Sequence, residues 1–129
     1  MNGKLILIVE DNEKNRKLVR DVLQFKGYVT LESTNAEDGI RLAKEHRPDL
    51  ILLDIQLPGI NGSAALSRLR HDPETESIPV IAVTASAMAQ DEHRLMAEGF
   101  DDYQRKPLEI REFIEVVRRR VEAGRRRVA

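Results

Sequence analysis

The 129-residue chain contains no cysteine, which excludes disulfides, thiolate metal sites and thiol nucleophiles. A stable domain without disulfides suits a reducing compartment, so we expect a cytoplasmic location. The sequence also lacks a long apolar run near its start. The run in MNGKLILIVEDN is too short for a membrane span or for the core of a signal peptide, and we expect no membrane association.

The sequence has little excess charge of either sign, because its formal net charge is −1 at pH 7. No overall field then favours nucleic acid or a membrane surface, and we predict neither as a partner. Arginines do gather locally near the end of the chain: Arg118, Arg119, Arg120, Arg125, Arg126 and Arg127. Their simplest interpretation is a solvated helix end that complements the helix dipole.

The length and the 41% hydrophobic content predict a single domain with one substantial core. Three short aliphatic runs, at residues 5–9, 50–53 and 80–83, lack the polar alternation of a half-exposed strand. We expect them to be strands buried on both faces, as in a parallel sheet covered by helices. Weaker strands are expected at residues 28–31 and 102–106, the last from its position alone.

Helical patterns fill the gaps between these strands. The first is a stripe of Leu18, Val19, Val22 and Leu23, and the second helix can be capped by Asn35. Further helical patterns lie around residues 65–69, 87–96 and 110–121. The alternation predicts an α/β fold of (βα)₅ order, with right-handed crossovers in a doubly wound parallel sheet.

Polar residues follow the predicted strands at the point where each one ends. Glu10 and Asp11 follow the first run, Asp54 the second and Thr84 the third, while Lys106 and Pro107 come late in the chain. In an open α/β sheet, functional groups lie outside the carboxyl ends of the strands. Clustered carboxylates without histidine or cysteine nearby favour Mg²⁺ over zinc as the cofactor.

Asp54 is the most informative of these acids, because it follows four aliphatic residues and so lies at the mouth of the core. A carboxylate there can attack phosphorus and form an acyl phosphate, while Lys106 offsets charge and Thr84 donates a hydrogen bond. Taken one by one, the acids could instead be helix caps, Thr84 an ordinary strand residue and Lys106 a solvated side chain. The ordered set favours the phosphoryl-transfer interpretation.

The segments IVEDNEKNRKL, PDLILLDIQLPGING, IPVIAVTASAM and DDYQRKPL resemble the receiver domains of two-component response regulators, in the CheY-like superfamily. The likeness is greatest to single-domain cell-cycle regulators and to receiver modules of hybrid histidine kinases. It implies a flavodoxin-like sheet with strand order 2-1-3-4-5. The receiver domain would cover residues 1–123, followed by a basic tail at 124–129.

The resemblance also implies roles for the residues at the strand ends. Asp54 would be phosphorylated, and Mg²⁺ would be held by Asp11, Asp54 and the backbone carbonyl of Gln56, with Glu10 acting through water. Thr84 and Lys106 would contact the phosphoryl group. Tyr103 would be an aromatic switch, and the bond from Lys106 to Pro107 would be cis. The Gln56 side chain would be left free to tune dephosphorylation.

The function implied is that of a phosphoacceptor switch and not a turnover enzyme. A histidine kinase or phosphotransfer protein would donate the phosphoryl group, and a downstream protein would read the face of the fourth helix, fifth strand and fifth helix, with the chain a monomer or weak dimer. The alternatives are a receiver module of a hybrid kinase and an unphosphorylated adaptor. A haloacid dehalogenase-like enzyme would need a second acid where this chain has Gln56.

Overall fold

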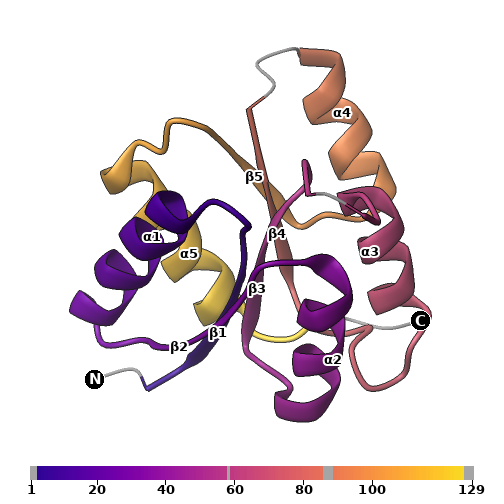
Figure 1. The fold of residues 1–129 in the computed structure, drawn as a ribbon, viewed down its shortest axis with the longest axis horizontal. Coiled ribbons are helices and arrows are strands. Elements are labelled where there is room, and N and C mark those ends of the chain that lie inside the picture. The colour runs from indigo at the N-terminus through magenta and orange to yellow at the C-terminus, as the bar shows by residue number, and fades with distance from the viewer. Residues whose placement is uncertain (1–2, 58, 86–88, 127–129) are drawn as a thin grey trace.

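The computed structural model describes residues 3–57, 59–85 and 89–126, in which five strands alternate with five helices (Figure 1). The strands are β1 (Leu5–Val9), β2 (Val29–Ser33), β3 (Leu50–Asp54), β4 (Val80–Thr84) and β5 (Asp102–Arg105). The helices are α1 (Glu13–Phe25), α2 (Ala36–His46), α3 (Gly62–Arg70), α4 (Ala89–Glu98) and α5 (Ile110–Ala123). Within this described part, no helix is long and apolar enough to cross a membrane.

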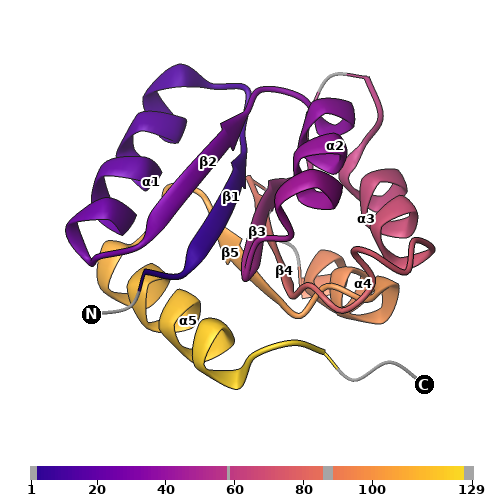
Figure 2. The same cartoon turned by 90° about the horizontal axis from the view of Figure 1, so that it is seen from below.

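The strands form one parallel sheet in the order β2-β1-β3-β4-β5, which confirms the predicted topology. Helices α1 and α5 cover one face, while α2, α3 and α4 cover the other (Figure 2). Side chains alternate along each central strand, so Ile6 and Ile8 pack with Phe113 on one side and Leu7 and Val9 pack with α2 and α3 on the other. This two-sided burial explains the unbroken aliphatic runs.

The element boundaries differ from the expected ones by a few residues. Strands β3 and β4 each extend one residue further than predicted and therefore include Asp54 and Thr84. Asn35 caps α2 as predicted, its side-chain oxygen accepting a hydrogen bond of 2.8 Å from the Asp38 amide. Helix α4 extends past the predicted end at residue 96, while the expected start at residue 87 lies outside the described residues.

The apolar stripe predicted for α1 lies on the helix, but only part of it is buried. The Leu18 side chain is 46% exposed, whereas Val19 and Leu23 are buried against the sheet. A stripe of adjacent pairs is wider than the part of a helix that a flat sheet can cover, so one edge of it remains in solvent. Leu18 is therefore available to line the surface beside the functional site.

The arginines after α5 are held by hydrogen bonds that the sequence did not indicate, although Arg125 is exposed as predicted. Arg125 donates to the backbone oxygens of Arg47 (3.0 Å) and Pro48 (2.9 Å), at the end of α2. Arg126 Nε lies 2.9 Å from Asp101 Oδ1, and the Arg126 amide donates to the Ser77 oxygen. These contacts tie the described part of the tail to loops at the amino-terminal edge of the sheet; Arg127 lies outside the described residues.

Asp101 is the acceptor that joins this tail to the core. Its Oδ2 accepts from Arg70 (2.9 Å) and from the Val80 amide (2.8 Å), and its Oδ1 accepts from Arg126. Burial, together with the nearby charge of Arg126, lowers the pKa of Arg70 to about 10. The carboxylate of Asp101 thus balances two guanidinium groups at the start of β4 and β5.

We expect Arg126→Ala to lower the free energy of unfolding by about 2 kcal/mol, because it removes a charge-assisted hydrogen bond to a mostly buried acceptor. Arg119→Ala is the matched control, because the Arg119 side chain is 59% exposed and its ion pair with Asp102 is long, at 3.7 Å. That control should change stability by less than about 0.5 kcal/mol. Urea denaturation of the three proteins measures the difference, and equal midpoints would show that the tail contact contributes nothing.

Candidate functional site

The predicted functional residues meet at the carboxyl edge of the sheet. Glu10 follows β1, Asp54 ends β3, Thr84 ends β4 and Lys106 follows β5. Because these strands are neighbours and parallel, their ends bring together residues separated by as many as 96 positions in the chain. The order of strands, and not proximity in sequence, therefore builds the site.

Lys106 is the centre of the site's ion pairs. Its Nζ lies 2.9 Å from Asp54 Oδ2 and 3.0 Å from Glu10 Oε1. The Asp54 side chain is only 3% exposed, and that of Glu10 only 7%. Backbone amides complete the acceptor sites, since Asp54 Oδ1 accepts from Gln56 (2.8 Å) and Glu10 Oε2 from Asn12 (3.1 Å). Neither acid acts as the helix cap, because Asn12 caps α1 and Asn61 caps α3.

These contacts shift the protonation equilibria of the site. Burial, together with a hydrogen bond and repulsion from Asp54, raises the pKa of Glu10 above its ordinary value of 4.5. Burial opposes the charged form of Lys106, but its hydrogen bonds to Asp54 and Glu10 outweigh that effect and raise its pKa. Lys106 is therefore a cation throughout the neutral range, held between two carboxylates.

The raised pKa of Glu10 predicts how the stability of the metal-free protein depends on pH. The folded state holds the Glu10 proton more tightly than the unfolded state, so this contribution to stability is complete below pH 4.5. This contribution to stability is lost as the pH rises through the raised pKa of Glu10 in the folded state. Denaturation in EDTA between pH 4 and 7 should show a shallower loss of stability for Glu10→Gln than for the wild type. Parallel curves would contradict the expectation.

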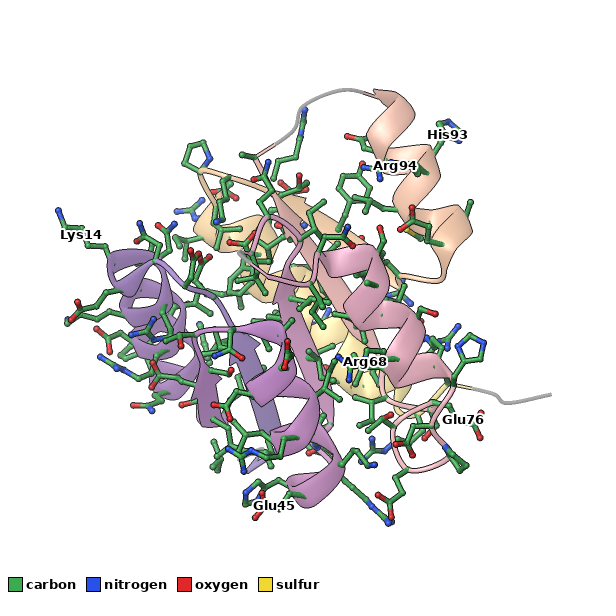
Figure 3. All side chains as sticks on the ribbon, turned by 45° about the vertical axis from the view of Figure 1, so that its right-hand side comes forward. Lys14, Glu45, Arg68, Glu76, His93 and Arg94 are labelled. Carbon is green, nitrogen blue, oxygen red and sulfur yellow. The ribbon has the colours of Figure 1, made fainter. Side chains whose placement is uncertain are left out.

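The carboxylates of Glu10, Asp11 and Asp54 form a cluster that could hold a cation. One oxygen from each lies within 4.8 Å of the others, with Asp11 exposed and the other two buried. The donors are all hard oxygens, which suits Mg²⁺. The three histidines, His46, His71 and His93, are exposed and lie on separate segments (His93 on the outer side of α4, Figure 3), in line with the absence of a nitrogen ligand from this cluster.

The remaining predicted residues border the site. Thr84 is buried, and its backbone oxygen accepts from the Lys106 amide at 2.8 Å. The Lys106–Pro107 bond is cis, as the resemblance implied. Tyr103 is half-buried on β5, two positions before Arg105, the register partner of Thr84. The Gln56 side chain is not free as expected, because its Oε1 accepts a 3.2 Å hydrogen bond from the Ala85 amide.

Two features of the site were not anticipated from the sequence. An apolar cavity of about 120 Å³ lies between α1 and α5 beside Asp54, lined by Leu18, Val19 and Phe113 among others. The carboxylate of Glu92, on α4, raises the pKa of Tyr103, on β5. Neither feature has a sequence signal, because each depends on how a helix is placed over the sheet.

Comparisons with known proteins agree with this geometry. The family described as response regulator receiver domain matches residues 6–118. The polar-differentiation response regulator DivK of Brucella anthropi is 48% identical over 115 residues, which cover 89% of this chain and 94% of that protein. DivK of Brucella abortus strain 2308 is 46% identical over the same shares of both chains.

Solved structures give the same result. The receiver domain of the sensor histidine kinase PA1611 from Pseudomonas aeruginosa PAO1 superposes with a TM-score of 0.85 at 31% identity, covering 93% of this chain and 98% of that one. That structure has a magnesium ion coordinated in its active site cleft. A putative response regulator from Chloroflexus aurantiacus J-10-fl gives a TM-score of 0.87 at 27% identity, covering 92% and 98% of the two chains.

Proposed function

Because this chain belongs to the response regulator receiver domain family, we propose that it is a switch that accepts a phosphoryl group on Asp54. One observation carries the choice of residue. Asp54 is a buried carboxylate at the carboxyl end of a central strand, held 2.9 Å from the ammonium of Lys106. Burying a carboxylate costs free energy, and buried ionisable groups with a specific charged partner are typical of functional sites.

The donor would be a phosphohistidine of a histidine kinase or a phosphotransfer protein. A carboxylate oxygen of Asp54 forms the new bond to phosphorus as the bond from phosphorus to the histidine nitrogen breaks, and the histidine nitrogen keeps that electron pair. Lys106 stays cationic and offsets charge on the phosphoryl oxygens, while the Thr84 hydroxyl can donate a hydrogen bond to one of them. The exposed Leu18 and the neighbouring cavity offer the donor an apolar contact beside the site.

The acidic cluster fits a magnesium ion. Asp11 and Asp54 would supply carboxylate oxygens, Gln56 its backbone carbonyl, and Glu10 would act through water. When bound, Mg²⁺ would neutralise charge on the phosphoryl group. The protein's own residues, the Gln56 amide and Lys106, hold the Asp54 carboxylate in place.

The signal would leave the site through Thr84 and Tyr103. A phosphoryl group on Asp54 adds a charge of about −1.5 to −2 and three acceptor oxygens, which draw Thr84 and Lys106 toward it. Movement of Thr84 opens space beside the end of β4, and Tyr103 moves inward to fill it. A downstream protein would read the altered face of α4, β5 and α5, and its differential affinity for the two forms would set the balance.

We expect the Thr84→Ala variant to accept the phosphoryl group on Asp54 but to pass the resulting structural change poorly to Tyr103. The nucleophile and Lys106 remain, so labelling should continue, while the hydrogen bond that would move the end of β4 is gone. Amide NMR with a phosphoryl mimic, beryllofluoride, should then show changes around Asp54 that no longer reach Tyr103. A Tyr103 response equal to that of the wild type would contradict this route.

Incubation with acetyl phosphate and Mg²⁺, followed by intact-mass measurement, tests the proposed function. The mass of one phosphoryl group should be gained. An unchanged mass, in a protein shown to be folded, would favour the adaptor alternative, which uses the same fold without phosphorylation. A turnover enzyme of the haloacid dehalogenase kind is disfavoured because Gln56 occupies the position where that chemistry needs a second acid.

A further inference from the structure

Arg16, near the start of α1, connects that helix to the loop after β1 and to the edge strand β2. Its Nη1 donates to the backbone oxygen of Glu10 at 3.1 Å, and its Nε donates to Glu32 Oε1 at 3.1 Å. The Arg16 side chain is 18% exposed, so both hydrogen bonds form in a mostly buried place between α1 and β2 (Figure 2). One guanidinium group therefore ties three neighbouring segments together.

The carbonyl group that Arg16 holds belongs to the peptide bond between Glu10 and Asp11. The amide of Glu10 is held as well, because it donates to the Ser33 oxygen of β2 at 3.0 Å. The atoms of a peptide unit are coplanar, so fixing the Glu10 oxygen also restrains the Cα atom of Asp11. Asp11 lies between β1 and α1 and belongs to neither element. Its orientation therefore depends on the peptide unit that Arg16 holds.

We propose that Arg16 is a positioning residue that orients the Asp11 carboxylate for the cation, an inference that rests on the function proposed above. Asp11 is the exposed member of the acidic cluster. The two buried members, Glu10 and Asp54, are already held by ion pairs with Lys106. An arginine has no acceptor atom and cannot coordinate a metal, so its contribution comes from placing a ligand in advance.

The positive charge of Arg16 would act in the opposite direction to this positioning. A cationic side chain near the acidic cluster repels Mg²⁺, so a residue that acted by its charge alone would weaken magnesium binding. Removing such a residue would tighten binding, whereas removing a positioning residue weakens it. We expect Arg16→Ala to lower the affinity for Mg²⁺ by about tenfold, the lower end of the range for residues that orient metal ligands.

Arg20 provides a matched control on the same helix. It lies one turn after Arg16 and donates to the same carboxylate, with its Nη1 3.3 Å from Glu32 Oε2. Its Nε donates to Asp21 on the helix, where Arg16 instead donates to the loop after β1. Arg20→Ala therefore removes an equal charge and a contact with the same partner, but leaves the Glu10 carbonyl bonded to Arg16.

Mg²⁺ is titrated into the wild type, Arg16→Ala and Arg20→Ala, and amide NMR shifts measured without a phosphodonor give the dissociation constants. Arg16→Ala should bind Mg²⁺ about tenfold more weakly, whereas Arg20→Ala should bind it at least as tightly as the wild type. Hydrogen exchange in EDTA gives a measure that needs no metal. The Asn12 amide, which donates to Glu10 Oε2 at 3.1 Å, should exchange about tenfold faster in Arg16→Ala alone, because its loop has lost one hydrogen bond.

Unchanged or tighter Mg²⁺ binding by Arg16→Ala overturns the inference, and so does an equal loss of affinity in Arg20→Ala. If Arg16→Ala is unfolded by circular dichroism, Arg16→Met keeps an aliphatic stem, removes every donor and is read in the same way. A wild type that binds Mg²⁺ but gains no phosphoryl mass from acetyl phosphate would instead refute the proposed function. The two failures are distinct, because the Mg²⁺ titration uses no phosphodonor.

Discussion

Asp54→Asn is expected to gain no phosphoryl mass under conditions that label the wild type completely. The amide has no anionic oxygen to attack phosphorus and cannot form a stable acyl phosphate. The fold should persist, because the amide oxygen can still accept from the Gln56 backbone N–H as Asp54 Oδ1 does. The result is a loss of chemistry with little loss of structure, which intact-mass measurement and circular dichroism record together.

Asp49→Asn provides a matched control for this variant. Asp49 directly precedes β3, the strand that Asp54 ends, and its Oδ2 accepts from the Leu5 amide at the opposite edge of the sheet. Labelling of that variant should equal the wild type. If Asp54→Asn were labelled as fully as Asp49→Asn, the phosphoryl group would have another acceptor and the site assignment would be wrong.

Much of the fold could be predicted from the sequence because its strands are buried on both faces. Such strands have unbroken aliphatic runs, and β1, β3 and β4 were located within one residue at each end. The edge strands were harder, since β2 has exposed Val29 and β5 has the polar sequence DYQR. The position of β5 came from the alternation with helices alone, and the order of all five strands came from the family resemblance.

The co-location of the site residues was predictable for a simple geometric reason. Parallel strands end at one edge, so a polar residue after each aliphatic run must lie near the others. Contacts that depend on how helices and tails pack over the sheet have no such rule. Arg125 donates to a carbonyl 78 positions away, and Glu92 lies 3.9 Å from Arg105 because α4 packs beside β5. The Gln56 side chain was expected to be free, because no sequence pattern indicates that it accepts a hydrogen bond from the Ala85 amide in another loop.

Asp11→Asn is expected to remove most of the response of this protein to Mg²⁺. The three carboxylates within 4.8 Å of one another repel in the metal-free state, and Lys106 neutralises only Glu10 and Asp54 directly. Asp11 is the exposed member of the cluster, so its replacement should not disturb the buried ion pairs. In EDTA the variant should be as stable as the wild type or more stable, because one repelling charge is gone.

Addition of Mg²⁺ should then separate the two proteins. A ligand that binds the folded state at 100 times its dissociation constant stabilises that state by about 2.7 kcal/mol, and the wild type should gain stability of this order. Asp11→Asn should gain little, and its labelling by acetyl phosphate should slow by about 100-fold, since a cation at a phosphoryl oxygen contributes several kcal/mol. Glu13→Gln, two residues along in the first turn of α1, is the control and should behave as the wild type. Equal thermal shifts in wild type and Asp11→Asn would place the cation elsewhere, whereas an unequal shift with unchanged labelling would separate metal binding from the chemistry at Asp54.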